Sequence, residues 1–302
     1  MTFHLESIPS QIGKIAIVTG GNNGLGFETT LGLAKKQIKV IMACRSLQKA
    51  KEAKLRIEKI VPGADIDTMF LDLSKFASVR FFASEFLTKY SRLDLLINNA
   101  GIMVPPFEKT ADGLESQMEV NYFSHFLLTG LLFEMLKKSP GSRVVSLSSI
   151  AHKNADIDFN NLNSEKSYSR MKAYGQSKLA CLVFAYELQR RIDAKNEKVI
   201  SVAAHPGVSP TNLFQHLPKI VTWMIKPFSS FISHLPESAA LPTLYAALGN
   251  DVYGGEFIGP TGFREMKGQP GKVTSSKISY DTALATNLWS VSEKLTMQKF
   301  EV

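Results

Sequence analysis

The sequence predicts an α/β fold, a doubly wound parallel sheet with helices on both faces. From Lys14 onward, short apolar runs alternate with longer segments whose apolar residues recur every three or four positions. The first apolar run ends in a glycine-rich turn that opens a helical segment. Strands that alternate with helices need crossover connections, and these make the strands parallel.

The expected elements follow in order along the chain. Each strand is a short apolar run bounded by turn residues, and each helix has apolar residues at helical spacing. We expect strands at 15–19, 40–44, 66–71, 93–97, 144–148, 199–203 and 256–258. We expect helices at 25–36, 47–60, 76–90, 114–137, 173–194, 237–248 and 281–295, the last capped by Asp281 or Thr282.

The regular alternation ends near residue 204, where prolines become frequent. They predict short helices forming a lid at about 208–236, inside a single domain that spans 1–302, with a C-terminal extension at about 261–302. If the lid forms, apolar and aromatic side chains line a greasy pocket beneath it; otherwise they are core residues. They are Met103, Phe107, His152, Trp223, Met224, Phe228 and Phe231.

The chain is basic, with a formal charge of +8 and a pI near 9.3. The excess is divided evenly between the two halves, and no nucleic-acid-reading module is recognisable, so we expect no nucleic-acid partner. One dense basic run occupies 35–59. It is either a solvated helix face or a source of positive potential for a bound anion.

Cysteine usage and hydropathy restrict the class of protein further. Cys44 and Cys181 make no CxxC spacing, so we expect neither a disulfide framework nor a metal site. A reducing, cytoplasmic location is the expectation. No signal peptide is apparent, and the apolar stretches at 126–136 and 220–235 fall short of the ~20 residues of a spanning helix. Peripheral contact with a membrane stays open.

The glycine-rich turn after the first strand reads Thr19-Gly-Gly-Asn-Asn-Gly-Leu-Gly26. Glycines there let the backbone approach a pyrophosphate, and the following helix N-terminus supplies free N–H groups. The spacing is Gly-x-x-x-Gly-x-Gly. Taken alone, the turn is equally well explained as a tight connection.

Arg45 follows the second strand, where a domain that prefers NAD usually carries an acidic residue for the ribose 2′-hydroxyl. A guanidinium at this point pairs well with a 2′-phosphate, and the basic run 35–59 would surround it. The alternative is a surface arginine at a strand end.

Two further strands end in polar residues. Asp72 follows the third strand and either contacts a ligand or caps the helix that begins near Lys75. Asn98-Asn99-Ala100-Gly101 follows the fourth strand and either lines a cofactor or bridges the backbone of its turn.

Tyr174 and Lys178 lie four residues apart in a predicted helix and therefore share one face. A phenol is a poor base near neutral pH, but an adjacent cation favours its ionised form. Ser149, at the end of the fifth strand, is placed to hold a substrate oxygen beside that phenol. The pair by itself also occurs by chance in many helices.

Together these pieces resemble the short-chain dehydrogenase/reductase family over about 14–260. The family pattern Thr-Gly-x-x-x-Gly-x-Gly, Asn-Asn-Ala-Gly, helix Asn, Ser, Tyr-x-x-x-Lys and Pro-Gly is present in order. Ala43-Cys-Arg45, Leu71-Asp-Leu-Ser74, His205-Pro-Gly-Val208 and Leu288-Trp-x-x-Ser-Glu-x-Leu295 are similar to its retinol-dehydrogenase-like branch. The resemblance implies a Rossmann-type fold, NADP(H) with NAD(H) as the alternative, and an apolar carbonyl or alcohol substrate.

The resemblance also implies a role for each matching residue. Tyr174 would be the acid/base, and Lys178 would support it and hold the nicotinamide ribose. Ser149, chosen over Ser148, would orient the substrate oxygen, and Asn121 would hold a water that relays protons to Lys178. The cofactor would contact Gly20, Asn22, Asn23, Gly24, Leu25, Gly26, Arg45, Asp72, Leu73, Asn98, Asn99, Ala100, Gly101, Tyr174, Lys178, Pro206, Gly207, Val208 and Thr211.

Alternatives stay open at this point. One is an enzyme of the same fold that acts on a polar substrate, and another is a nucleotide-binding sensor without catalysis. Family members commonly form dimers or tetramers through their long helices, here the segments 114–137 and 173–194, so a homo-oligomer is also expected.

Overall fold

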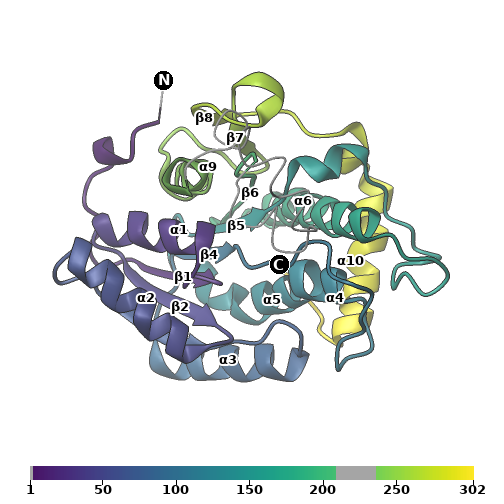
Figure 1. Ribbon diagram of the computed structural model, residues 1–302, viewed down its shortest axis with the longest axis horizontal. Coiled ribbons are helices and arrows are strands. Elements are labelled where there is room, and N and C mark those ends of the chain that lie inside the picture. Colours follow the sequence, from purple (N-terminus) through teal and green to yellow (C-terminus); the bar gives the residue numbers. More distant parts are fainter. Residues whose placement is uncertain (1–2, 209–235) are drawn as a thin grey trace, which may run out of the picture.

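The computed structural model describes residues 3–208 and 236–302. Its centre is an eight-stranded sheet in the order β3-β2-β1-β4-β5-β6-β7-β8 (Figure 1). All neighbouring pairs are parallel except β7 and β8. The strands are β1 Ile15–Thr19, β2 Lys39–Cys44, β3 Ile66–Phe70, β4 Leu95–Asn98, β5 Arg143–Leu147, β6 Ile200–Ala204, β7 Phe257–Pro260 and β8 Pro270–Lys272.

Helices cover both faces of this sheet, as the alternating pattern predicts. One face carries α1, α2 and α9, and the other carries α3, α5 and α6 (Figure 1). Their bounds are α1 Gly24–Lys35, α2 Leu47–Ile60, α3 Phe76–Lys89, α4 Ser116–Met118, α5 Ser124–Lys137, α6 Arg170–Ala194, α9 Pro236–Leu248 and α10 Thr282–Thr296. The predicted doubly wound fold is confirmed.

Two local predictions need correction. The single helix expected at 114–137 is divided, because the π-helical segment Glu119–Phe123 separates α4 from α5. The turn-rich stretch after β7 contains one more strand, the short antiparallel β8.

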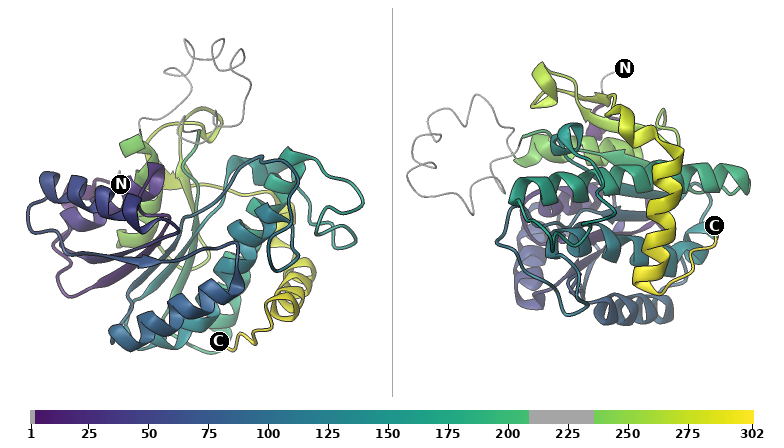
Figure 2. Two further views of the ribbon diagram at one scale, coloured as in Figure 1. Left: turned by 60° about the horizontal axis from the view of Figure 1, so that its bottom comes forward. Right: turned by 90° about the vertical axis from the view of Figure 1, so that its right-hand side faces the viewer.

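The C-terminal helix α10 lies across the outer faces of α5 and α6 (Figure 2). Trp289 is 3% exposed and packs edge-on against Phe126 of α5, with ring centroids 5.1 Å apart. It also stacks on Phe184 of α6, and Phe300 completes the cluster. This chain's own C-terminus thus covers part of the two long helices that are expected to pair with a second copy, and the oligomer stays a prediction.

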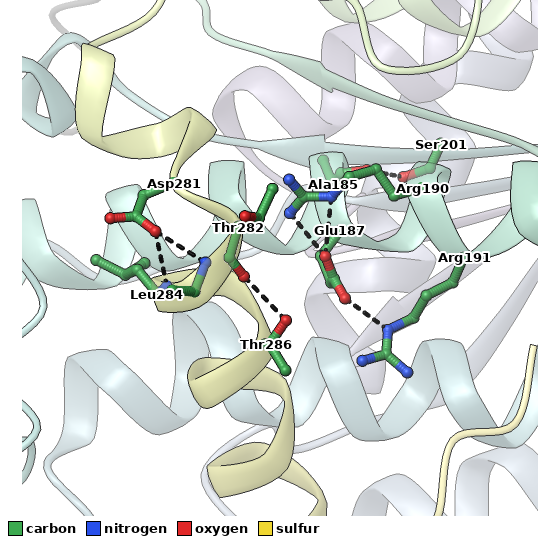
Figure 3. Close-up of polar contacts among 10 residues, drawn as sticks. Ala185, Glu187, Arg190, Arg191, Ser201, Asp281, Thr282, Leu284 and Thr286 are labelled. Carbon is green, nitrogen blue, oxygen red and sulfur yellow. Dashed lines mark hydrogen bonds and ion pairs between the residues drawn. The ribbon is translucent and has the colours of Figure 1, made fainter.

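Polar contacts within each of the two helices flank the same junction (Figure 3). Asp281 caps α10 by accepting hydrogen bonds from the N–H groups of Ala283 and Leu284, as predicted. On α6, Glu187 accepts from both Arg190 and Arg191. The guanidinium of Arg191 lies 4.1 Å from the ring centroid of Trp289, so the ion pair also covers the aromatic cluster.

Most of the predicted lid, residues 209–235, lies outside the described residues. Within residues 3–208 and 236–302, no helix combines the length and apolarity needed to cross a bilayer. The same residues contain no group of three or more His, Cys, Asp or Glu side chains arranged to hold a metal ion.

Candidate active site

The candidate site lies at the carboxyl ends of the strands, where the order reverses between β1 and β4. Open parallel sheets bind ligands in the crevice at such a reversal, because the crossovers leave in opposite directions there. β1, β2, β3 and β4 end in the segments that the sequence singled out. The fold therefore brings the predicted motifs to one edge.

The glycine-rich turn takes a shape that side chains would prevent. Gly20 and Gly24 have φ of +65° and +50°, in the left-handed region that favours glycine. A Cβ added to Gly26 would lie 2.2 Å from the carbonyl oxygen of Gly20. Asn23 caps α1 by accepting from the Gly24 N–H. This bare turn at a helix N-terminus fits a dinucleotide pyrophosphate.

A cleft of about 460 Å³ adjoins this turn. It collects predicted residues from four separate loops, namely Gly20, Asn22, Arg45, Asp72, Leu73, Ala100 and Gly101. Arg45 is exposed at its rim, and its guanidinium has no partner among the described residues. Lys75 and Lys109 also line the cleft, and the sequence analysis did not single them out because no motif marks them.

Asp72 forms its own turn and does not cap a helix. Its Oδ1 accepts from the N–H and the hydroxyl of Ser74, at 3.1 and 2.7 Å. Helix α3 begins at Phe76, whose N–H donates instead to Asp112, 36 residues further along the chain. The capping alternative for Asp72 is wrong, and its carboxylate lies in the cleft wall.

The basic run 35–59 does not surround the cleft. Lys39 begins β2, at the opposite end from Cys44, and pairs with Asp65 and Asp67 at 2.8 and 3.4 Å. Helix α2 then leads away from the cleft, and at 1.5 Å per residue its last turn, with Lys59, is ~20 Å from its first. Of the basic residues in the run, Arg45 alone lines the cleft.

Thr19 joins the strand ends to each other. Its Oγ1 accepts from the N–H groups of Asn99 and Ala100, both at 2.9 Å, and lies 2.9 Å from Nε2 of His125. The amide of Asn99 donates to the carbonyl of Thr19. Asn98 is different, because it is buried and its amide donates to Thr129 of α5, away from the cleft.

Asn121 lies in the π-helical segment, and both polar atoms of its side chain have hydrogen-bond partners. Its Oδ1 accepts from the N–H of Ile102, and its Nδ2 donates to the carbonyl of Ile102 and to Ser177 of α6. His125 Nδ1 lies 2.9 Å from the Asn121 carbonyl, and burial lowers the pKa of His125 to about 4. Sequence reasoning missed His125, although it lies four residues after Asn121.

Tyr174 and Lys178 of α6 line a second cavity of about 160 Å³ beside the first. Lys178 is 6% exposed; its Nζ donates to the carbonyl of Leu147 at 3.0 Å and lies 5.9 Å from the Tyr174 ring centroid. The Tyr174 hydroxyl has no hydrogen-bond partner among the described residues. Leu25, Met103 and Pro206 add apolar surface.

The two serines after β5 differ in environment. The hydroxyl of Ser148 is buried and donates to the backbone carbonyl of Lys178 at 2.8 Å, although the residue borders the cavity. Ser149 is half-buried, lies just beyond the cavity lining, and accepts from the N–H of Ala151. Ser149 thus has the freer hydroxyl.

The segment after β6 completes the rim, and Pro206 lines the cavity. Gly207 has φ of +76°, and the N–H of Val208 donates to the carbonyl of Met266. Thr211 lies outside the described residues, as do Trp223, Met224, Phe228 and Phe231. Of the expected pocket-lining residues, Met103 borders the cavity, Phe107 packs on Tyr168, and His152 is buried elsewhere.

Comparison with known families decides the identity of this arrangement. The model of the family described as short chain dehydrogenase matches residues 14–220, more than half of the chain. The protein is a short-chain dehydrogenase. Its membership explains why the glycine-rich turn, the Asn-Asn-Ala-Gly segment and the tyrosine–lysine pair meet at one sheet edge.

Named relatives place this short-chain dehydrogenase in the retinol-dehydrogenase-like branch. Retinol dehydrogenase 11 of Mus musculus is 43% identical over 236 residues, covering 78% of this chain and 73% of the relative. Polyprenol dehydrogenase of Danio rerio is 36% identical over 295 residues, covering 96% and 89%. The dehydrogenase is accordingly an oxidoreductase acting on CH–OH donors.

A solved structure shares the fold over the whole length. It is described as a putative uncharacterized protein from Mycobacterium Paratuberculosis, is 36% identical, and covers 100% of both chains with a TM-score of 0.84. The similarity therefore extends through the C-terminal extension.

Proposed function

We propose that this dehydrogenase transfers hydride between NADP(H) and a carbonyl or alcohol on an apolar, retinoid-like substrate. The observation that carries the proposal is the hydroxyl of Tyr174, which no described residue hydrogen-bonds, beside the buried Lys178 ammonium in a cavity that adjoins the dinucleotide cleft.

In this proposal each residue of the site has a separate role in the reaction. A bound nicotinamide supplies the hydride in the reducing direction. Tyr174 donates its proton to the carbonyl oxygen, and the Lys178 ammonium stabilises the phenolate that remains. Ser149 hydrogen-bonds the same substrate oxygen and orients it. In the oxidising direction Tyr174 takes the proton back.

Asn121 supports this arrangement through the backbone. By holding both polar groups of Ile102 and the hydroxyl of Ser177, it fixes the Gly101–Met103 wall of the cavity against α6. A π-helical turn leaves such a side chain at an unusual position, which is a frequent feature of functional sites. The proposed proton-relaying water would lie between this segment and Lys178.

Arg45 supports the preference for NADP(H). Its guanidinium is exposed, unpaired among the described residues, and at the rim of the cleft that the adenosine end would occupy. A guanidinium binds phosphate oxygens in a bidentate manner, which a ribose hydroxyl cannot match.

The apolar substrate is supported by the cavity wall and by the relatives. Leu25, Ile102, Met103 and Pro206 contribute carbon atoms to the wall around Tyr174. Retinol and polyprenol, the substrates in two relatives' names, are long apolar alcohols.

The decisive experiment measures NADPH oxidation with a panel of aldehydes and ketones, from retinal-like to sugar-like, for the wild type and Tyr174→Phe. We expect turnover with the apolar members and a loss of ~100- to 10,000-fold in kcat in the variant, because general acid catalysis contributes that much. NADPH affinity should be unchanged. Equal turnover of Tyr174→Phe, or activity confined to polar substrates, would contradict the proposal.

A further inference from the structure

Two buried histidines connect the C-terminal extension to the rim of the active site. His152 and His205 are both fully buried and flank the ring of Phe257 in β7, with centroid distances of 5.3 and 5.0 Å. Burial lowers the pKa of both imidazoles, so both rings are neutral near pH 7. A neutral imidazole has one donor and one acceptor, and its neighbours decide which nitrogen is which.

His152 connects residue 276 to the loop that carries Ser149. Its Nε2 accepts from the N–H of Ser276 at 3.2 Å, so its proton is on Nδ1. That Nδ1–H donates to the carbonyl oxygen of Ser149 at 2.6 Å. The extension therefore holds the backbone of Ser149 through this ring.

His205 connects residue 265 to the turn after β6, in the opposite tautomer. Its Nδ1 accepts from the N–H of Gly207 at 3.2 Å, which leaves the proton on Nε2. Nε2 lies 3.2 Å from Oε2 of Glu265, a close polar contact whose N–H is not well aligned. Neither of these buried atoms has another hydrogen-bond partner among the described residues.

Glu265 also binds the Ser149 loop. Its Oε1 accepts from Nζ of Lys153 at 2.6 Å, and Lys153 belongs to the 3₁₀ helix Ile150–Asn154 that Ser149 caps. The contacts with His205 and Lys153 lower the pKa of Glu265 to about 2. One ionised carboxylate thus joins the segments that leave β5 and β6, on both sides of the cavity.

The backbone around Glu265 is held in an unfavourable shape. Arg264 and Glu265 have φ of +49° and +56°, which residues with a Cβ rarely adopt. The carbonyl of Met266 accepts from the N–H of Val208 at 2.9 Å, and a Cβ on Gly207 would lie 2.3 Å from that carbonyl oxygen. Surrounding contacts must over-determine such a turn for it to persist.

We propose that Glu265 is a positioning residue of the active site. Through His205 it fixes the Pro206–Val208 turn, and through Lys153 it fixes the Ser149 loop. The distance between these two sides of the cavity is therefore held constant. The inference rests on the proposed function for its kinetic consequence. The contacts themselves are independent of the substrate.

The kinetic test compares Glu265→Gln with a matched control, Glu256→Gln. Glu256 also lies in the C-terminal part and is similarly exposed, at 23% against 17%. It pairs with Lys272 at 2.7 Å and accepts from the N–H of Tyr253, away from the cavity. The two variants therefore remove comparable ion pairs, and only one of them adjoins the active site.

We expect Glu265→Gln to lower kcat/KM for the carbonyl by about tenfold to a hundredfold, because small displacements of reacting groups have effects of that size. Its Kd for NADPH should rise, since the Pro206–Val208 turn moves. Glu256→Gln should keep both values within about twofold of wild type, even if its melting temperature falls equally. Equal kinetics and equal NADPH affinity in the two variants would overturn the proposal.

A second readout needs no turnover. Nitrogen-15 NMR of the histidine rings at pH 7 should show His152 protonated on Nδ1 and His205 on Nε2. Glu265→Gln should shift the ring signals of His205 and leave those of His152 in place. A charged His205, or one protonated on Nδ1, would overturn the proposed positioning by Glu265. If no carbonyl is reduced but these signals are found, the proposed function fails and the positioning role of Glu265 stands.

Discussion

The nucleotide cleft and the C-terminal extension are built on different principles. In the cleft, strand ends and tight turns supply backbone groups, and Arg45 is left exposed and unpaired among the described residues. The extension instead contacts residues that are very distant in sequence. Arg80 donates to the carbonyl of Thr296, 216 residues away, and Ser276 donates to His152, 124 residues away. One region presents groups to a ligand, and the other holds the protein's own parts in place.

This difference predicts how each region responds to substitution. A change in the cleft should alter binding with little effect on folding, because its groups are exposed or belong to the backbone. A change in the extension should alter stability first, because its side chains are buried against α5, α6 and the loop after β5. A change at Glu265 should alter both ligand binding and stability.

Trp289→Ala should have the largest effect on stability. The indole is 3% exposed and packs against Phe126, Phe184 and Phe300. Its removal would leave a cavity among these three rings. Truncating a buried tryptophan costs ~3–5 kcal/mol, so we expect a fall of that size in the free energy of unfolding, measured by urea denaturation.

Ser290→Ala is the matched control, because Ser290 is the next residue of α10 and is exposed. Its effect should stay within ~0.5 kcal/mol. Light scattering should also show that Trp289→Ala self-associates, since loosening α10 uncovers apolar faces of α5 and α6. If both variants unfold at the same urea concentration, the extension is not the anchor that its burial indicates.

Glu119→Gln tests the buried π-helical segment Glu119–Phe123 through the pH dependence of stability. Glu119 is fully buried in the π-helical segment, where its carboxyl group accepts from the hydroxyl of Thr110 and its Oε1 has no hydrogen-bond partner in the described part of the chain. Burial, together with Asp112 and Asp72, raises its pKa from 4.5 to about 8. The side chain is therefore protonated in the folded protein at neutral pH, and a neutral glutamine mimics that form.

The raised pKa fixes the sign of the effect. As pH rises above 4.5, the unfolded chain loses the Glu119 proton while the folded protein keeps it up to about pH 8, so stability falls across this interval. Glu119→Gln lacks this fall. We expect it to be more stable than wild type by ~1–3 kcal/mol at pH 8, with a smaller difference at pH 5, in urea denaturation at both values. An equal difference at the two pH values would contradict the raised pKa.

The features that the sequence predicts correctly are those that depend on residues close together along the chain. The β1–α1 turn, the tyrosine–lysine pair and the alternation of strands and helices depend on residues close in sequence or on a period, and the structure contains all three. Asp281 as the α10 cap follows the same rule.

What the sequence did not reveal depends on contacts between distant residues. Asn121 of the π-helical break before α5 donates to Ser177, which is 56 residues away, and such a contact leaves no local pattern. The contact of His152 with Ser276, 124 residues away, is not visible in the sequence, which leaves His152 among the candidate pocket residues. The sequence also cannot tell whether the basic run 35–59 surrounds a bound anion, because β2 and α2 place its members at opposite ends of the strands.

The last prediction concerns Arg45, where ligand affinity should change and stability should not. Arg45→Ser removes an exposed guanidinium, so the melting temperature without cofactor should stay within about 1 °C of wild type. Losing one charge-assisted phosphate contact costs ~1.5–3 kcal/mol, so Kd for NADPH should rise at least about tenfold while Kd for NADH stays nearly constant. Fluorescence titration measures both constants.

Lys59→Ser is the control, since it removes one charge of the same run at the far end of α2 and should leave both affinities unchanged. If Lys59→Ser weakens NADPH binding as much as Arg45→Ser, the whole run acts as a long-range field; if neither variant does, another cation of the cleft, such as Lys75 or Lys109, holds the phosphate.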